Sequence, residues 1–373
     1  MRPHFLLLTL FSILLALASP ARAEIKIALA APLSGPDAVF GTQLRNGAEQ
    51  AATDINAKGG VLGQKFIIVP FDDRGDLKQG IAIANRLVDE KIFFVIGHFY
   101  SSITLAASEI YANHSILEIT PSATNPQITE RGLDLIFRTC GRDDQQSAVA
   151  AKYLAAQTGK KIAILFDNTA YGKELADDVR QRLAKAGIQD VLYAGIDKGS
   201  KDYGRLVGRI KAAAADLVYW GGGDADAGLL LKKMRAESIT AQLLGTDSLA
   251  SDEFARAGEA AVEGALMTFP ADPRRRLQAA GVVREFRARD IDPEVFTLNA
   301  YAAVEVLAQA AKAAGTFDPV TIAKTIHSGR PFPTVLGTLT YDAKGDVTTP
   351  DYAVYVWRRG YEDQLEYGEL ATQ

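Results

Sequence analysis

The chain has 373 residues, of which 48% are hydrophobic, and its 41 basic and 45 acidic residues give a formal net charge of −4. This slightly acidic composition, without a basic stripe that carries interleaved aromatic residues, argues against a nucleic-acid partner. The single cysteine, Cys140, excludes an intramolecular disulfide, and its strand-like surroundings predict a buried structural thiol.

The first 23 residues have the three parts of a secretory signal peptide. Arg2 gives a positive start, residues 5–18 are almost wholly apolar, and Ala21-Arg22-Ala23 is a small-x-small cleavage site. A membrane anchor is the alternative, but the apolar stretch is shorter than the roughly 20 residues that a spanning helix needs. We therefore expect residues 1–23 to be removed and the rest of the chain, long enough for two domains, to be exported as a soluble protein.

Strand-like and helix-like stretches alternate through the first part of the remaining chain. Strands are expected at 25–30, 66–71, 93–96 and 116–119, and helices at 41–55, 77–89 and 104–113. The pattern restarts after a bridging stretch at 139–143. Helices are then expected at 144–157, 173–186, 203–214 and 225–236, and strands at 161–166, 191–194, 216–220, 242–245 and 265–269. This alternation predicts an α/β protein with two doubly wound parallel-sheet lobes.

The pattern changes after Pro270. Helices are expected at 277–290, 293–314 and 319–328, and strands at 337–341 and 352–357. The middle helix is rich in alanine and needs a sheet face to cover, so we expect the chain to return to the first lobe. The predicted division is residues 24–141 plus 271–349 for the first lobe and 142–270 plus 350–373 for the second. Several crossings between the lobes would form a hinge, and hinged lobes close around ligands.

Motifs typical of enzymes are missing from the sequence. It has no Gly-x-Ser-x-Gly elbow and no Walker loop, and none of its four histidines has a metal-ligand partner at a suitable spacing. The segment Gly221-Gly222-Gly223-Asp224-Ala225-Asp226 resembles a dinucleotide fingerprint, but Asp226 stands where that fingerprint needs glycine. We therefore expect no catalytic activity, no cofactor and no metal.

Four of the predicted strands run at their carboxyl ends into small polar or glycine-rich turns. These turns are Ser101-Ser102, Ser122-Ala123-Thr124, Tyr171-Gly172 and Gly221-Gly222-Gly223. Ligands of open α/β sheets bind outside the carboxyl ends of the strands. Because two turns fall in each half of the chain, the sequence predicts a small polar ligand held between two lobes.

Three of these positions fit the head group of an α-amino acid. Ser101 at a helix start and the Ser122–Thr124 turn offer N–H groups and hydroxyls to a carboxylate, and Asp247, just past a strand, offers a carboxylate to an ammonium group. Each has a simpler reading as a helix cap or capping turn. Phe40, Phe99, Tyr171 and Phe296 are candidates for the wall of a side-chain pocket, although a place in a core is the favoured reading for each.

Five ordered motifs give the chain a resemblance to a known family. They are Ala31-Pro32-Leu33-Ser34-Gly35-Pro36, Asp54-Ile55-Asn56-Ala57-Lys58-Gly59-Gly60, Val95-Ile96-Gly97-His98, Ile119-Thr120-Pro121-Ser122-Ala123-Thr124 and Tyr341-Asp342-Ala343-Lys344-Gly345-Asp346. Over nearly the whole mature chain the sequence resembles the periplasmic leucine/isoleucine/valine-binding proteins, which serve ABC transporters and have the type I two-lobe fold. The resemblance implies a monomeric periplasmic binding protein that is not an enzyme, with an inner-membrane ABC permease as its partner.

The resemblance also implies roles for individual residues. Ser101 matches the serine that binds the ligand carboxylate, and Ser122, Ala123 and Thr124 match the loop that holds the carboxylate and amino group. Asp247 matches the acidic partner of the ammonium, which is often Glu. Tyr171 matches the Tyr-Gly turn of the second lobe, and Phe40 and Phe296 match aromatic pocket positions.

The sequence departs from the family pattern at a pocket position, which affects the expected ligand, and at a disulfide, which is lost. Gly223 stands where many members have a tyrosine that helps to clamp the carboxylate, and Gly75 and Tyr100 stand at the positions of a frequent disulfide. Gly223 makes room for a larger, aromatic side chain. The sequence thus predicts an amino acid with a branched-chain or other apolar or aromatic side chain. It leaves three alternatives open: an aromatic or aliphatic carboxylate without an amino group, a sensory or amide-binding domain on the same fold, and an exported enzyme.

Overall fold

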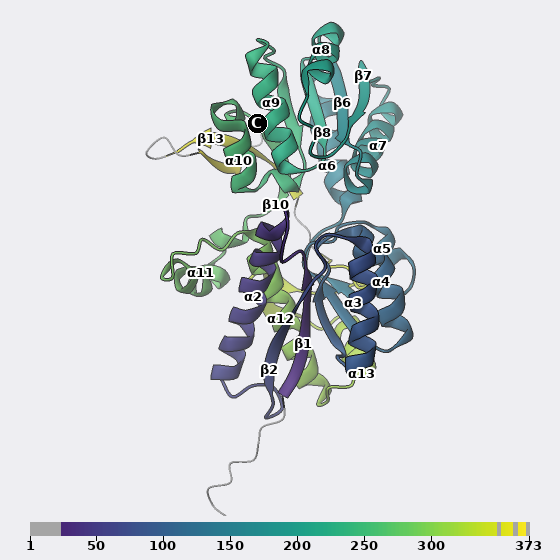
Figure 1. The fold of residues 1–373 in the computed structure, drawn as a ribbon, viewed down its shortest axis with the longest axis vertical. Helices are drawn as coiled ribbons and strands as arrows, with labels where there is room; N and C mark the ends of the chain where they lie inside the picture. The colour runs from purple at the N-terminus through teal and green to yellow at the C-terminus, as the bar shows by residue number, and fades with distance from the viewer. Residues whose placement is uncertain (1–23, 349–351, 361–364, 371–373) are drawn as a thin grey trace, which may run out of the picture.

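The computed structural model describes residues 24–348, 352–360 and 365–370 and shows two lobes, one above the other in Figure 1. The predicted signal peptide at 1–23 lies outside the described residues. Within the described ranges, no helix is both long and apolar enough to cross a membrane.

The first lobe is built on a five-stranded parallel sheet with the order β2-β1-β3-β4-β5. Its strands are β1 (Glu24–Ala31), β2 (Lys65–Asp72), β3 (Phe94–Gly97), β4 (Leu117–Thr120) and β5 (Ile136–Arg138). Ile27 and Leu29 of β1 pack into one core and Ala28 and Ala30 into another, because successive side chains of a strand point to opposite faces. Both faces are therefore covered, as the doubly wound prediction requires.

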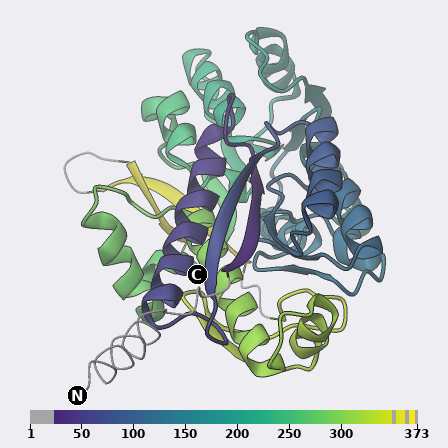
Figure 2. The same ribbon diagram turned by 60° about the horizontal axis from the view of Figure 1, so that its bottom comes forward.

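Helices from both ends of the chain cover this sheet. The covering helices are α2 (Ala38–Ala57), α12 (Val295–Ala314) and α13 (Pro319–His327) on one face, and α3 (Leu77–Glu90) and α4 (Ser101–Asn113) on the other. The green helix α12 lies beside the purple α2 in Figures 1 and 2. A Cβ at Gly47 of α2 would lie 1.9 Å from the carbonyl oxygen of Thr297, so this close helix contact needs glycine.

Smaller elements complete the first lobe. They are the short helix α5 (Gln127–Glu130) and an antiparallel hairpin of β11 (Phe332–Thr334) and β12 (Gly337–Leu339). The hairpin follows α13 and packs its apolar residues, Phe332 and Leu339, into the same core as α2 and α12.

The second lobe has a seven-stranded sheet with the order β14-β13-β10-β9-β8-β6-β7. Its strands are β6 (Ile162–Asp167), β7 (Leu192–Ile196), β8 (Leu217–Gly221), β9 (Gln242–Gly245), β10 (Leu266–Pro270), β13 (Tyr352–Arg359) and β14 (Leu365–Glu369). The strands β7, β6, β8, β9 and β10 are parallel to one another, whereas β13 and β14 are antiparallel additions at one edge. The sequence did not predict β14, whose residues are mostly half-exposed and pair with β13 alone.

Two helical layers cover the second sheet. They are α6 (Asp143–Ala156) and α7 (Ala170–Lys185) on one face, and α8 (Gly204–Ala213), α9 (Asp224–Ala236) and α10 (Asp252–Gly258) on the other. The 3₁₀ turns η1 (Asp247–Leu249) and η2 (Glu259–Val262) flank α10. Trp220 of β8 is fully buried in the core beneath α8, α9 and α10.

The helix expected at 277–290 is wrong in extent. The structure has the 3₁₀ turns η3 (Pro273–Arg275) and η4 (Leu277–Ala279), and then α11 (Ala280–Arg287). Leu277 is 90% exposed, so its side chain makes no buried contact that would help to hold the first turn in a continuous helix.

Three connections join the lobes: β5 to α6, β10 to the segment leading into α12, and β12 to β13. The residue-level lobe boundaries at 141/142 and 270/271 remain predictions. The boundary at 349/350 lies outside the described residues.

Candidate ligand-binding site between the lobes

The polar residues predicted to form a site all follow the carboxyl ends of parallel strands. Ser101 follows β3, the Ser122–Thr124 turn follows β4, Tyr171 follows β6, Gly223 follows β8 and Asp247 follows β9. In both lobes, these are the ends at which ligands of open α/β sheets bind.

In the first lobe, the turns after β3 and β4 hold one another. The Ser122 hydroxyl donates a hydrogen bond to the carbonyl oxygen of Phe99 (3.1 Å), and Ser101 Oγ accepts one from the backbone N–H of Asn125 (3.3 Å). Tyr100 occupies the N-cap position of α4, and Ser101 is the first residue of the helix. The N-cap alternative for Ser101 is therefore wrong, and its hydroxyl faces the Ser122–Thr124 turn instead.

A buried arginine, Arg138, fixes the shape of the turn after β4. Its guanidinium donates hydrogen bonds to the carbonyl oxygens of Ala123 (3.0 Å) and Asn125 (3.2 Å) and forms an ion pair with Asp346 at 2.6 Å. Arg138 is fully buried, so its charge depends on this pairing. The sequence analysis missed this residue, and the only local signal was an arginine within an otherwise apolar strand.

Cys140 lies behind the same turn. Its thiol donates to the carbonyl oxygen of Ala123 at 3.5 Å, and burial raises the pKa of the thiol to about 12. The prediction of a buried thiol is confirmed.

In the second lobe, Tyr171 and Asp247 form a pair. The Tyr171 hydroxyl donates to Asp247 Oδ1 at 2.7 Å, and the backbone N–H of Asp247 donates to Gln146 Oε1 at 2.8 Å. Thr246 is the N-cap of η1, so the interpretation of Asp247 as a cap is wrong. Burial raises the pKa of Asp247 above its ordinary value although several hydrogen bonds act in the opposite direction.

Gly223 leaves open space at the start of α9. Its backbone N–H donates to Asp167 Oδ2 at 2.8 Å, and a Cβ added here would meet only Asp167 Oδ2, at 3.8 Å. Its φ of −72° is accessible to any residue, so nothing in the backbone requires glycine. The absence of a side chain at Gly223 thus leaves open space beside the start of α9.

The three phenylalanines predicted as pocket walls lie together in the first lobe. The Phe40 and Phe99 rings stack with their centroids 4.7 Å apart, and Phe296 meets them edge-on at 5.9 and 5.1 Å. They come from the start of α2, the turn after β3 and the start of α12. Because Phe99 also accepts the Ser122 hydrogen bond, the aromatic cluster adjoins the polar turn.

The two lobes touch at contacts that the sequence did not predict. The Asn125 side chain bonds to Glu174 of α7, and Lys198 Nζ lies 3.2 Å from Asp37 Oδ1 and 3.3 Å from the Tyr100 hydroxyl. Gly75, the other position of the family disulfide, lies beside Tyr100, because a Cβ built on it would be 2.9 Å from the Tyr100 ring.

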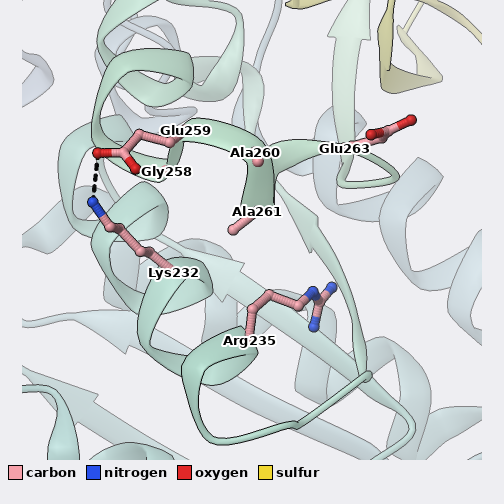
Figure 3. Close-up of a pocket in the computed structure, with 7 residues that line it drawn as sticks. All are labelled: Lys232, Arg235, Gly258, Glu259, Ala260, Ala261 and Glu263. Atoms are coloured by element: carbon pink, nitrogen blue, oxygen red, sulfur yellow. Dashed lines mark hydrogen bonds and ion pairs between the residues drawn. The ribbon is translucent and has the colours of Figure 1, made fainter.

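Two surface hollows lie away from these residues. One, in Figure 3, is on the second lobe between α9 and η2, where Lys232 pairs with Glu259 beside Arg235 and Glu263. The other lies near His327 on the first lobe. Neither includes any predicted site residue. Among the described residues, no group of three or more His, Cys, Asp or Glu side chains is placed to hold a metal ion.

Comparisons with known proteins agree with this architecture. A family model described as "Periplasmic binding protein" matches residues 24–362. The Leu/Ile/Val-binding protein homolog 1 of Brucella suis biovar 1 is 44% identical over 354 residues, 95% of each chain. An "Amino acid binding protein" of Pseudomonas aeruginosa is 44% identical over 363 residues, 96% of each chain.

Solved structures show the same two-lobe fold. A leucine-binding protein from Thermotoga maritima has a TM-score of 0.83 and 25% identity, covering 92% of this chain and 97% of its own. An ABC transporter substrate-binding protein from Desulfitobacterium hafniense, in complex with Leu, has a TM-score of 0.77 and 27% identity, covering 92% and 99%. These are binding proteins and not enzymes. The chain belongs to the periplasmic binding protein family, among the relatives of the Leu/Ile/Val-binding protein homologues.

Proposed function

We propose that this protein is the substrate-binding component of an ABC importer and captures an amino acid with an apolar side chain, branched or aromatic, between its lobes. The observation that carries the proposal is the arrangement at Asp247. Its carboxylate is fixed by Tyr171, and within the described parts of the chain it forms no ion pair with a basic side chain. An ammonium group of a ligand would supply the missing positive charge.

The first lobe supplies the complementary half of the site. The Ser101 hydroxyl and the backbone N–H of Thr124 are suited to the ligand carboxylate, whereas the N–H groups of Ser122 and Ala123 already donate to Thr120 Oγ1. The phenylalanine cluster is suited to an apolar side chain. The ligands of the relatives support this assignment, since the relative from Desulfitobacterium hafniense was solved with Leu and those from Brucella are named for Leu, Ile and Val.

The proposal includes the setting in which the protein works. It is exported through the signal peptide at 1–23, acts in the periplasm as a monomer, and delivers its ligand to an inner-membrane ABC permease. The lobes close on the ligand, and the ion pair of Lys198 with Asp37 between the lobes supports such a closure.

A thermal-shift screen of ligand-stripped mature protein tests the function. At a concentration 100-fold above the Kd, a ligand adds about 2.7 kcal/mol to the stability of the folded protein. We expect leucine or phenylalanine to raise the melting temperature and their deaminated analogues, 4-methylpentanoate and 3-phenylpropanoate, to have no effect. Shifts with the carboxylic acids alone would instead establish the alternative ligand class and leave Asp247 without a ligand role.

A further inference from the structure

A half-buried arginine, Arg235, lines the pocket of the second lobe that Figure 3 shows. The pocket lies between the carboxyl end of α9 and the turn η2 and has a volume of about 610 Å³. Gly223 and the candidate ligand-binding site lie at the other end of α9, about 18 Å away at the rise of an α-helix. The pocket is therefore separate from that site, and its volume is typical of pockets that bind small molecules.

Backbone contacts fix the direction of the Arg235 side chain. Its Nη1 donates hydrogen bonds to the carbonyl oxygens of Ile239 (2.6 Å) and Ala241 (3.0 Å), in the connection between α9 and β9. A structural role in holding this connection explains Nη1 alone. Nε and Nη2, which form the edge that binds carboxylates through two parallel hydrogen bonds, make no hydrogen bond with the residues that the structure describes.

The other charged side chains that line the pocket are already paired. Lys232 pairs with Glu259 at 2.5 Å, and Glu263 pairs with Arg359 at 3.0 Å. Figure 3 shows the Lys232–Glu259 pair on one side of the pocket and the Arg235 guanidinium on the other. Because no carboxylate in the described parts of the chain forms an ion pair with Arg235, one positive charge of the pocket lacks a counter-charge.

Burial makes this missing counter-charge unfavourable. It lowers the pKa of Arg235 from its ordinary value, because water is withdrawn from a charged group. Arginine nevertheless stays protonated at neutral pH, so a bound anion would gain a charge-assisted interaction. The guanidinium is already held by Nη1, and little conformational freedom remains to be lost when an anion binds.

We propose that this pocket is a second binding site and that it takes a small organic monocarboxylate, whose two oxygen atoms accept hydrogen bonds from Nε and Nη2 of Arg235. A doubly charged phosphate is disfavoured, because Glu259 and Glu263 also line the pocket and would repel it. The methyl groups of Ala260 and Ala261 are suited to a short apolar chain on the ligand. This second site goes beyond the proposed function and does not depend on which ligand binds between the lobes.

An NMR titration of the mature protein, ¹⁵N-labelled and deuterated, with sodium propanoate tests the proposal at pH 7. Sodium chloride keeps the ionic strength constant. Two charge-assisted hydrogen bonds correspond to a Kd on the order of 1–10 mM, so we expect the Nε–Hε signal of Arg235 to shift and to saturate in this range. Arg284 of α11 is the internal control, because it is exposed and forms no ion pair with any described residue; its signal should not saturate.

The variant Arg235→Lys separates the paired donors from the positive charge. It keeps the charge and loses the two parallel donors, so we expect the Kd for propanoate, followed at the backbone N–H of Ala261, to rise about fivefold or more. The matched control is Arg256→Lys on α10, which replaces an exposed arginine that pairs with Glu253. This control should bind propanoate as the original protein does.

Three results would overturn the proposal. An Arg235 signal that does not saturate up to about 100 mM propanoate, or an equal Kd in Arg235→Lys, removes the site. A Kd for inorganic phosphate at or below that for propanoate removes the assignment to a monocarboxylate. The first result needs no variant, so it remains decisive even if Arg235→Lys does not fold.

Discussion

The Asp247→Ala variant tests whether this carboxylate binds the ligand ammonium. Tyr171 and Gln146 hold Asp247 in place, and the described residues offer it no ion pair. Truncating one partner of a buried, hydrogen-bonded charge pair costs about 2–5 kcal/mol. We therefore expect the Kd for leucine to rise by about 30-fold to several thousand-fold.

The measurement is isothermal titration calorimetry on ligand-stripped protein at pH 7. Asp247→Asn adds a second comparison, because it keeps the approximate shape of the side chain and removes only its charge, and it should also lose most of the affinity. The control is Glu253→Gln, which removes an exposed carboxylate on α10 that pairs with Arg256. This control should bind as the original protein does.

An unchanged Kd in Asp247→Ala, with the variant folded as judged by its circular dichroism spectrum, would refute the proposal that Asp247 binds the ammonium group of an amino acid. Equal losses of affinity for leucine and for 4-methylpentanoate would also contradict it, because the latter has no ammonium group for Asp247 to bind.

Four further changes follow from the structure. Gly223→Tyr should fold, since a Cβ has room there, and should lower the affinity for phenylalanine relative to leucine in calorimetry; an unchanged ratio would show that this position does not limit the pocket. Lys198→Ala should weaken leucine binding by less than about fivefold, because its ion pair with Asp37 is partly exposed. A larger loss of affinity in titrations at both low and high salt would contradict this small contribution of an exposed ion pair. Arg138→Met should lower the free energy of unfolding in urea by about 1.5–3 kcal/mol, because it removes one of the two arginines that pair with the buried Asp346 carboxylate while Arg142 stays. Burial raises the pKa of Asp143 to about 8 in the folded protein, whereas the unfolded chain loses this proton near pH 4, so the contribution of Asp143 to stability is present below pH 4 and falls by up to about 1.4 kcal/mol per pH unit towards pH 8. Urea titrations at pH 5 and pH 8 should therefore show a smaller loss of unfolding free energy in Asp143→Asn than in the original protein. An equal loss in both proteins would be inconsistent with this titration.

The amino-acid sequence was sufficient to predict the elements that carry the site. Apolar strands such as Ile162–Asp167 and the small polar turns after them are local patterns, and the topology of parallel sheets places strand ends at the same edge. The family resemblance predicted Ser101, the Ser122–Thr124 turn and Asp247 as site residues, and each follows the end of a predicted strand.

The tertiary structure alone decided which groups support these residues. Arg138 reaches Asp346, Gln146 meets Asp247, and Lys198 meets Asp37 across the lobes, over separations in the chain of more than 100 residues. The edge strand β14 depends in the same way on pairing with β13. Periodicity reports only on neighbours within a few turns, whereas burial, charge pairing and a raised pKa arise when distant segments exclude water from the same space. For this reason the sequence shows Asp143 only as the end of a connecting stretch, whereas the folded chain makes it a buried carboxyl group whose backbone N–H donates to Thr124 of the first lobe.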